Sequence, residues 1–552
     1  MANPRIVIGL DFGTTYSGVA WALSDSPKEP EVIASWPGSG NRTTPKVPST
    51  MALKCGRRLQ WGYQTSFFGD HIRGVKILLD ESQDPKYVAA LESAGFIKKN
   101  RQSPITYAGL YLEQLDLHTR NILQRRFGTA VHGMEMHYVL TVPAVWSDKA
   151  KDATLKAALN AGIPHQDITL VSEPEAAALH CMTVIRPNSI RDGDVVVVCD
   201  AGGGTVDLIS YCVKTVSPLR LEESVEGTGG ICGSMMLDVG FTQFLDALLD
   251  TKKIADKARE MALRFWQDNI KPNFASDPDF LEEIHFVPLP GVKDNSKIGL
   301  RDGFLQLDGT QIKKIFDPIV GQVQDLIEDQ VTRARGSGQS VKAILLVGGF
   351  GASDYLYQCT QKAHSGIIVM QPPNSWSAVM LGAVRHGVEG NKVGTRIARR
   401  HYGVKFRTSS RKLMKKYPDV PRVWCDLEEK WFVWNMVEWY IHKGDKILEN
   451  KPVRFPFWRA VACDGTIMFD DQLYVCGDAE APERLHNRVF GVCNLKSDLR
   501  AISTTLFRRK TNSKGKEYYH IKYYLVMTPR SASIDFELEF NGASYGHVEA
   551  TY

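Results

Sequence analysis

Cysteine is scarce in this sequence, and the few cysteines are scattered. Ten of the 552 residues are cysteine, with no CxxC pair and no cluster of histidine and cysteine at zinc spacing. This spacing argues against a disulfide framework and against a structural zinc site. Isolated, reduced thiols are typical of a cytosolic protein, so we expect a cytoplasmic location.

Long apolar runs are also missing. The longest, such as Val195–Cys199, are far shorter than the roughly 20 residues that span a bilayer. The first residues, Met1–Arg5, run directly into a short apolar strand, with no extended hydrophobic stretch or cleavage site after it. We therefore expect no membrane partner and no secretory signal.

Neither sign of charge dominates the sequence. The 67 Lys and Arg residues against 62 Asp and Glu give a formal net charge of +5. Nucleic-acid binding needs a concentrated basic face, so we expect no nucleic-acid partner. The length is too great for one core, and 43% hydrophobic with 23% charged residues predicts a globular protein of three or more units.

Two kinds of pattern divide the chain near residue 389. Before it, short apolar runs rich in β-formers alternate with helical stretches, which predicts α/β layers with helices on both faces of the sheets. After it, alternating aromatic runs such as Trp431–Ile441 and Tyr518–Met527 are separated by turn signals such as Asn541-Gly542. That pattern predicts an antiparallel β-sandwich. The basic, glycine-containing stretch between the two patterns is expected to be a linker.

The first part of the chain contains an internal duplication. Ile6–Thr15 reads IVIGLDFGTT, and Val195–Thr205 reads VVVVCDAGGGT. Each copy is an apolar strand followed by an aspartate, Asp11 or Asp200, and then by a turn of glycine and threonine. Two such copies predict two related lobes, each of which presents one loop to a shared cleft.

These loops have the residue types that phosphate binding requires. Glycines allow backbone N–H groups to point at phosphate oxygens, and the threonines add hydroxyl donors. Asp11 and Asp200 stand where a carboxylate can hold Mg²⁺ through water, since Mg²⁺ dehydrates reluctantly. A third loop, Ala343–Ser353 (AILLVGGFGAS), places two glycines between a strand and a helix. That loop either approaches a sugar or phosphate or is simply a tight turn.

Taken together, these motifs resemble those of the heat-shock protein 70 family, within the actin-like ATPase superfamily. DFGTTYSG at Asp11–Gly18 looks like the first phosphate loop of that family, and DAGGGTVD at Asp200–Asp207 looks like the second. VGGFGAS at Val347–Ser353 is similar to its adenosine loop. SEPEAAAL at Ser172–Leu179 resembles a stretch that separates these chaperones from actin and the sugar kinases.

The resemblance implies a two-lobed, actin-like ATPase domain (ribonuclease-H-like and duplicated), followed by an antiparallel β-sandwich. The ATPase domain is expected over residues 1–389, with lobe I at about 1–192 and 370–389 and lobe II at about 193–369. A linker at 390–402 and a β-rich substrate-binding-like domain at 403–552 complete the expected organisation.

The resemblance also implies roles for single residues. Lys76 is expected beside the γ-phosphate and Glu173 near the attacking water, with Asp200 and Asp207 as further catalytic groups. Asp11, Asp200 and Asp207 match the acidic residues around Mg²⁺ and the monovalent cations, so ATP or ADP with Mg²⁺ is expected, and K⁺ is a further candidate. The residues expected to contact the nucleotide are Gly13, Thr14, Thr15, Tyr16, Gly202, Gly203, Gly204, Thr205, Gly229, Gly230, Asp268, Lys271, Gly348, Gly349 and Phe350.

The sequence departs from the family pattern at three places. On the adenosine side, Phe350 and Trp376 replace polar residues, and each either stacks on adenine or belongs to the core. The acidic, leucine-rich linker of the family is missing. No helical lid or acidic tail is visible, which places ordinary J-domain partnership in doubt and leaves a polypeptide client as the expected partner.

Two hypotheses about function follow. The first is a chaperone-like protein that hydrolyses ATP slowly and couples its nucleotide state to the β-rich domain. The alternative is a nucleotide-sensing binding module with little or no turnover; a sugar kinase or an actin homologue comes third. Among smaller features, Trp431, Trp434, Trp439 and Trp458 are expected in the core rather than in a ligand groove, and Cys199 and Cys232 are expected to be inert.

Overall fold

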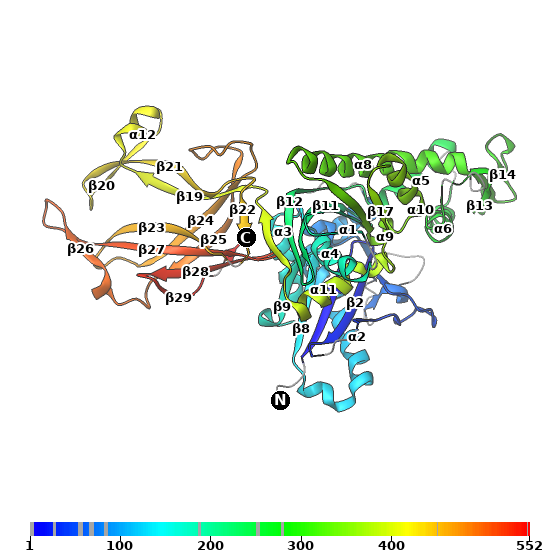
Figure 1. Ribbon diagram of the computed structural model, residues 1–552, viewed down its shortest axis with the longest axis horizontal. Helices are drawn as coiled ribbons and strands as arrows, with labels where there is room; N and C mark the ends of the chain where they lie inside the picture. The colour runs from blue at the N-terminus through cyan, green and yellow to red at the C-terminus, as the bar shows by residue number, and fades with distance from the viewer. Residues whose placement is uncertain are drawn as a thin grey trace. The chain divides into compact units, whose positions relative to one another are not determined.

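The computed structural model divides into two compact units, Met1–Val393 and Gly394–Tyr552 (Figure 1). It describes residues 5–25, 29–52, 59–65, 71–81, 87–185, 189–249, 254–275, 277, 281–449, 451–548 and 550–552. Within these ranges, no helix has the length and apolar character needed to cross a membrane.

The first unit is built around two sheets with matching topology. In one, the strand order is β3-β2-β1-β8-β9, with β4 also paired to β2. In the other, the order β17-β16-β10-β11-β12 is found. In both sheets the leading strand, β1 or β10, pairs antiparallel with the next strand in sequence and parallel with a later one, β8 or β16. This common plan confirms the duplication that the two glycine-rich motifs predict.

The strands and helices of the first unit have these bounds. In the first sheet they are β1 (Ile6–Asp11), β2 (Tyr16–Leu23), β3 (Glu31–Val32), β4 (Val47–Pro48), β8 (Met136–Val142) and β9 (Ile168–Ser172). In the second they are β10 (Val195–Ala201), β11 (Val206–Val216), β12 (Leu219–Gly230), β16 (Val341–Val347) and β17 (Ile368–Met370). Small sheets add β5 (Thr50–Ala52), β6 (Gln60–Trp61), β7 (Ile72–Arg73), β13 (Ile284–Pro288), β14 (Leu300–Arg301) and β15 (Phe304–Asp308). The α-helices are α1 (Val88–Lys99), α2 (Pro104–Phe127), α3 (Asp148–Asn160), α4 (Glu173–Val184), α5 (Met235–Leu248), α6 (Asp256–Phe265), α8 (Gly309–Gly336), α9 (Gly348–Gly351), α10 (Asp354–Ala363) and α11 (Ala378–Glu389).

The helix boundaries follow from local chemistry. Helix α3 starts after Ser147, whose hydroxyl accepts a hydrogen bond from Ala150 N at 3.2 Å, as the predicted N-cap should. Helix α8 starts at a capping box in which Asp308 and Gln311 satisfy each other's backbone N–H groups. These caps fix where each helix leaves its sheet and therefore where the preceding loop ends.

Helices α4 and α11 lie between the two sheets of the first unit. Helix α11 packs on β1, β2 and β8, while α4 packs on α11, β10 and β11. The buried cluster around them takes residues from both halves, including Val7 and Val139 of the first sheet and Val196 and Val198 of the second. One continuous core therefore joins the two halves behind the glycine-rich turns.

The second unit is an antiparallel sandwich, as predicted. One sheet has the order β20-β21-β19-β24-β25-β30, and the other has β23-β27-β28-β29 with β26 paired to β27. Both sheets contribute to one core, with Leu473 and Leu495 from the first and Phe455, Leu525 and Phe536 from the second. The strands are β19 (His401–Thr408), β20 (Arg422–Cys425), β21 (Lys430–Ile441), β23 (Val453–Ala462), β24 (Met468–Cys476), β25 (Val489–Asp498), β26 (Arg508–Thr511), β27 (Glu517–Pro529), β28 (Ile534–Phe540), β29 (Ala543–His547) and β30 (Ala550–Thr551), with one helix at α12 (Arg411–Lys416).

The stretch expected to be a linker, 390–402, is partly a strand. Residues of β18 (Val393–Ile397) pair antiparallel with β22 (Lys446–Leu448), with Thr395 opposite Leu448. The side chains of Val393 and Thr395 are buried. A basic composition suggested solvent exposure, but alternate residues of this stretch are small or apolar, and that alternation lets it pair as a strand.

Candidate functional site

The turns of the two glycine-rich hairpins face each other in the first unit. A Cβ atom added to Gly204 would lie 2.7 Å from Thr14 Oγ1, and one added to Gly203 would lie 2.9 Å from Thr15 Cγ2 and clash with Oγ1. Glycine is therefore required in the second turn because the threonines of the first turn already fill that space. The predicted shared cleft is formed by these two turns.

The cleft has a volume of about 1420 Å³. It brings together most of the residues singled out from the sequence, from both hairpins, from the adenosine loop and from the segments that carry the predicted lysine and glutamate. These are Asp11, Gly13, Thr14, Thr15, Tyr16, Lys76, Glu173, Asp200, Gly202, Gly203, Gly204, Thr205, Asp268, Lys271, Gly348, Gly349 and Phe350.

Three predicted residues do not line the cleft. Asp207 lies opposite Asp200 on β11 and is buried, and its Oδ1 accepts a hydrogen bond from Val145 N at 3.3 Å. Gly229 and Gly230 end β12, where they pair with Asp207 and Val206. The glycine pair therefore stands behind the second hairpin instead of at the edge of the cleft, because β12 continues the ladder up to that point.

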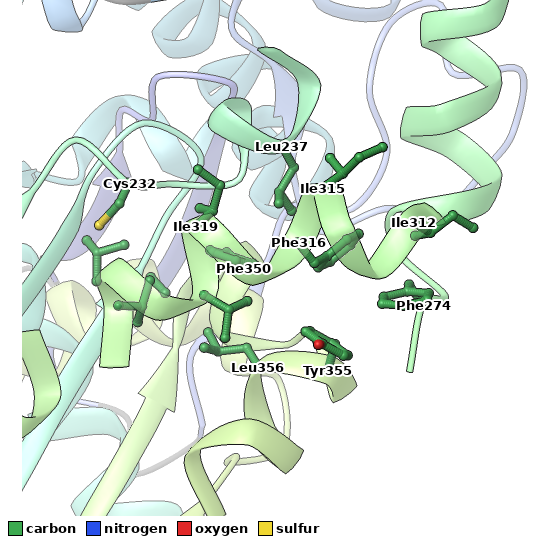
Figure 2. Packing of buried hydrophobic residues seen from close by; sticks show 14 of the residues in the cluster. Cys232, Leu237, Phe274, Ile312, Ile315, Phe316, Ile319, Phe350, Tyr355 and Leu356 are labelled. Carbon is green, nitrogen blue, oxygen red and sulfur yellow. The ribbon is translucent and has the colours of Figure 1, made fainter. Parts of the chain in front are cut away.

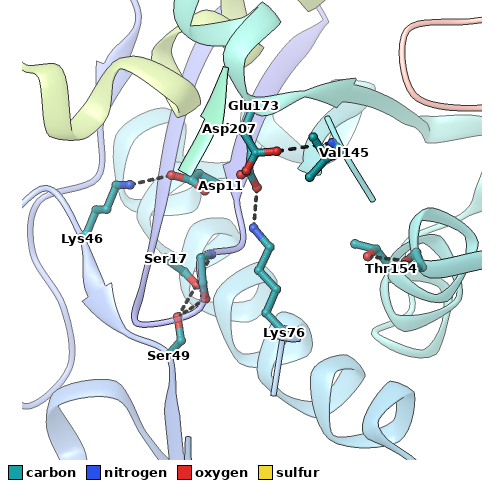
Figure 3. A network of polar contacts seen from close by, with 11 residues as sticks. Asp11, Ser17, Lys46, Ser49, Lys76, Val145, Thr154, Glu173 and Asp207 are labelled. Carbon is teal, nitrogen blue, oxygen red and sulfur yellow. Dashed lines mark hydrogen bonds and ion pairs between the residues drawn. The ribbon is translucent and has the colours of Figure 1, made fainter. Parts of the chain in front are cut away.

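Two buried ion pairs lie at the base of the cleft (Figure 3). Lys76 Nζ makes a short contact with Glu173 Oε1, and Lys46 Nζ lies 2.5 Å from Asp11 Oδ2. Glu173 is the first residue of α4, so the end of β9 positions it, and Lys76 comes from the turn just before a short 3-10 helix. The predicted Lys76 and Glu173 thus lie together, whereas Lys46 was not predicted.

The carboxylates outnumber the lysines at this place. Burial, followed by the charges of Glu173, Asp11 and Asp207, raises the pKa of Asp200 well above its ordinary value. Burial likewise raises the pKa of Glu173 to about 7, even though Lys76 opposes the shift. Burial is the main cause of both shifts and the neighbouring carboxylates add to it, so a further cation placed among these groups would be stabilised.

The donor set fits Mg²⁺ held through water. Among the described residues, no three His, Cys, Asp or Glu side chains are arranged to hold a metal ion directly. Mg²⁺ usually keeps several waters and takes only one or two carboxylates together with phosphate oxygens. Asp200 at the cleft wall and Asp207 behind it would hold such a hydrated ion, in keeping with the excess of negative charge.

A set of serine hydroxyls fixes the first turn. Ser17 Oγ and Ser49 Oγ are 2.8 Å apart, Ser49 Oγ donates to Gly13 O at 2.7 Å, and Gly13 N donates to Ser17 Oγ at 3.3 Å. Sequence reasoning missed Ser49 and Lys46. Both flank β4, which reaches the first hairpin only by pairing with β2, and no spacing in the sequence signals that pairing.

Aromatic residues lie on the side of the cleft that the sequence predicts to hold adenosine. Phe350 is 3% exposed and packs with Leu237, Ile319 and Leu356 in the core of the second half (Figure 2). Of its two predicted roles, core packing is therefore the one the structure shows. Trp376 lines the cleft, with its ring centroid 5.5 Å from that of Tyr16, which lines the cleft as well.

The predicted ribose contacts are engaged with neighbouring side chains. Lys271 Nζ donates to Asp238 Oδ1 at 2.8 Å, and the exposed Asp268 accepts a hydrogen bond from Arg264 Nε at 3.2 Å. Both line the cleft, so both remain within reach of a ligand. The expected inertness of Cys199 and Cys232 fits their burial, which raises the pKa of both thiols, that of Cys232 to about 12.

The tryptophans of the second unit are not core residues, contrary to expectation. Trp431 is 52% exposed and Trp434 is 37% exposed, and neither Trp439 nor Trp458 belongs to the buried cluster of the sandwich. The reason is local. Among the described residues, the outer edge of β21 pairs with the four-residue β20 and, through a single bridge, Met436 with Arg484, so no long strand lies beside it.

The chain is similar along most of its length to chaperones of the 70-kDa heat-shock class. It is 23% identical over 492 residues to "Heat shock 70 kDa protein 12A" of Homo sapiens, which covers 72% of each chain. It is 23% identical over 496 residues to "Heat shock 70 kDa protein 12B" of Homo sapiens, which covers 73% of this chain and 71% of that one. A shorter alignment, 25% identical over 356 residues, relates 62% of this chain to 52% of "Chaperone protein DnaK" of Mycoplasmopsis synoviae.

The second unit has a match of its own. Residues 396–551 match a family model described as a domain of unknown function (DUF8568). The range lies within the second compact unit, Gly394–Tyr552. Two actin-like lobes around a glycine-rich cleft, a β-rich unit after them and the similarity to these chaperones together support a chaperone-like, nucleotide-binding protein. The chain is a divergent heat-shock-70-like protein.

Proposed function

We propose that the first unit binds ATP with Mg²⁺ in its cleft and hydrolyses it slowly. The observation that supports this most strongly is the meeting of two facing glycine-threonine turns with the buried pair Lys76–Glu173 at their base. Phosphoryl transfer asks little covalent chemistry of the protein and depends on positioning and charge stabilisation. The cleft has groups for both tasks.

Each group has a role that follows from its place. The backbone N–H groups and hydroxyls of the two turns would hold the phosphate oxygens, and Lys76 would offset the charge that develops on the transferred group. Glu173 would orient the attacking water and, with its pKa raised to about 7, accept its proton. Bound Mg²⁺ would neutralise the phosphates, and Asp200 and Asp207 would hold it through its water molecules.

A titration followed by analysis of the ligand tests this proposal. Purified protein is titrated with ATP and with ADP in a calorimeter with Mg²⁺ present, and the recovered nucleotide is identified by mass. We expect binding of both, slow conversion of ATP to ADP, and loss of conversion in Glu173→Gln and Lys76→Met. The control is Glu92→Gln, on the exposed side of α1. Failure of the wild-type protein to bind either nucleotide would overturn the proposal.

The Lys76–Glu173 contact also favours a second candidate, a nucleotide-sensing module. An ion pair between the two proposed catalytic groups holds Glu173 away from a water molecule unless the ligand separates them. In that case ATP binds but is recovered unchanged after hours. The mass analysis distinguishes the two candidates, because conversion of bound ATP to ADP within those hours is incompatible with a sensor that does not turn over its ligand.

We further propose that the nucleotide state is coupled to the β-rich unit, which would bind a polypeptide client in the cytoplasm. A ligand shifts a conformational equilibrium only by its different affinity for the two states, typically about 1–3 kcal/mol. We expect ATP to change protease cleavage within 389–416, and Asp200→Ala to abolish that change. Equal cleavage with ATP, with ADP and without nucleotide, at proven saturation, would leave the units merely tethered.

A further inference from the structure

Lys46 is a cation that the fold itself places in the cleft. Its Nζ lies 2.5 Å from Asp11 Oδ2, and the two side chains are only 7% and 6% exposed. Its backbone is held as well, because the carbonyl oxygen of Lys46 accepts hydrogen bonds from Tyr63 Oη and Thr44 Oγ1, each at 3.1 Å. The next residue, Val47, pairs with Ser17 of β2. The ammonium group is therefore positioned by the same sheet that carries Asp11.

The two related hairpins differ in how their aspartates are neutralised. Asp11 has the ammonium group of Lys46 in contact, whereas in the part of the chain that the structure describes no ion pair includes Asp200. Asp200 instead faces Asp207 across its hairpin. The place beside the second aspartate can therefore take a bound cation, while the first aspartate already faces a positive charge that belongs to the chain itself.

A monovalent metal ion does not fit at Asp11. An ion that bound the same carboxylate oxygen would lie against the ammonium group and be repelled by its like charge, in a buried place where screening by water is weak. An ammonium group is a compact point charge with three donors, so it can neutralise the carboxylate and also donate to a phosphate oxygen. The ammonium group of Lys46 thus occupies the place beside Asp11 that K⁺, a candidate from the sequence, would need.

We propose that Lys46 serves as a built-in monovalent cation beside Asp11, so that nucleotide binding in this cleft needs no K⁺. The proposal rests on the proposed function for its nucleotide. Its electrostatic part, neutralisation of Asp11 by Lys46, holds in the free protein too. Removal of the ammonium group should create a dependence on K⁺ that the wild-type protein lacks.

The first experiment measures affinity. Calorimetry with ADP and Mg²⁺ is run in KCl, NaCl and N-methyl-D-glucamine chloride at equal ionic strength, for the wild-type protein, Lys46→Met and the exposed control Lys98→Met. We expect wild-type and control affinities to agree within about twofold across the salts. We expect Lys46→Met to lose at least about tenfold in N-methyl-D-glucamine chloride and to recover in KCl. A tenfold K⁺ requirement in the wild-type protein, or a Lys46→Met variant that binds equally in all three salts, would overturn the proposal.

The second experiment uses no nucleotide and so separates this proposal from the proposed function. Urea unfolding of free Lys46→Met should shift to higher urea in KCl than in N-methyl-D-glucamine chloride, because K⁺ then occupies the place beside Asp11. The wild-type protein and the double variant Asp11→Asn/Lys46→Met should show no such difference. The double variant removes both charges and is the folded reference if Lys46→Met alone is unstable. A K⁺ effect on the wild-type protein equal to that on Lys46→Met contradicts the proposal even if nucleotide binding is never found.

Discussion

The hairpins β1–β2 and β10–β11 share one backbone plan but differ in the residues around their aspartates. Both consist of a fully buried first strand, an aspartate at its end and a turn of glycine and threonine, and both pair with a parallel strand on the far side. They differ in what packs against the aspartate: β4 brings Lys46 to Asp11, while β11 brings Asp207 opposite Asp200. The two copies thus share one backbone arrangement, and the residues packed against each aspartate determine the electrostatic environment of its carboxylate.

The largest effect that separates the two copies should be on stability. Asp11→Asn leaves the buried Lys46 without its partner, and loss of one member of a buried ion pair typically costs about 3–5 kcal/mol. Asp200→Asn removes a carboxylate whose charged form is disfavoured by burial, so we expect no loss or a gain. Urea unfolding without nucleotide, with hydrogen exchange read out on β1 and β10, measures both. Equal destabilisation by the two substitutions would mean that the aspartates are electrostatically equivalent.

Acid should weaken the packing between the two halves. His180, on α4, is 3% exposed, neither ring nitrogen has a partner among the described residues, and burial together with Arg385 lowers its pKa to about 4. Below the ordinary value near 6.5, the unfolded chain binds a proton that the folded chain does not. Stability from this group is therefore complete above about pH 6.5 and falls by up to about 3 kcal/mol as the pH drops to 4.

The titration is checked by urea unfolding between pH 4 and pH 7.5 for the wild-type protein and His180→Leu. Between pH 4 and pH 6.5, unfolding of the variant should take up about one proton fewer than unfolding of the wild-type protein, so its unfolding free energy should depend less steeply on pH. Arg385 faces His180, with Glu29 as a weaker, opposing charge, and both stay constant between the two proteins. Identical slopes for the two proteins would rule out His180 as the titrating group.

A pair of glycine substitutions tests how closely the two turns approach. Gly203→Ala should cost about 1–3 kcal/mol, because its Cβ would collide with the side chain of Thr15 in the other hairpin. Gly13→Ala should cost at least as much, because its Cβ would collide with the backbone carbonyl oxygen of Tyr16 in its own hairpin. Thr15→Ala should therefore rescue only Gly203→Ala, which a double-mutant cycle in urea detects. Rescue of both, or of neither, would show that the turns do not meet as described.

The smallest effect concerns the aromatic pair Tyr16–Trp376, which touches only the first hairpin. Tyr16 begins β2 and contacts Trp376, whereas the corresponding residue of the second hairpin is the buried Val206. Aromatic contacts of this kind contribute about 0.5–1.5 kcal/mol, so Trp376→Leu should weaken ATP binding by roughly two- to tenfold. Triphosphate without a base, used as a competitor, should bind both proteins equally. A Trp376→Leu variant that lost affinity for triphosphate alone would place Trp376 at the phosphates.

What could be predicted from the sequence was what lies in continuous segments. The two turns and the aspartates before them are contiguous motifs, and an apolar strand followed by glycines has few other interpretations. Lys46 could not be predicted, because its position depends on the pairing of β4 with β2. Phe350 was ambiguous for a similar reason: an aromatic residue after a glycine pair faces a ligand or the core according to how α9 turns, and here it turns toward Leu237.

In the second unit, too, the sequence predicts the elements but not which of their side chains are buried. Its alternating aromatic runs predict strands correctly, yet alternation alone does not say which face is covered. Trp431 pairs with Trp424 of the four-residue β20, Trp434 lies just beyond that pairing, and both remain exposed. The strand β18 was missed because its basic residues resemble a linker and its partner, β22, lies about fifty residues later.

Helices α4 and α11 touch backbone to backbone where they cross. Any Cβ on Gly382 would collide with the carbonyl oxygen of Ala176, and the surrounding positions are small, with Ala177, Ala178 and Ala383. Helices whose contacting residues are small can slide past each other without repacking interdigitated side chains. Small sliding of packed helices is one way in which lobes close. The crossing therefore allows the two helices to slide against each other, and any larger residue at Gly382 would obstruct that movement.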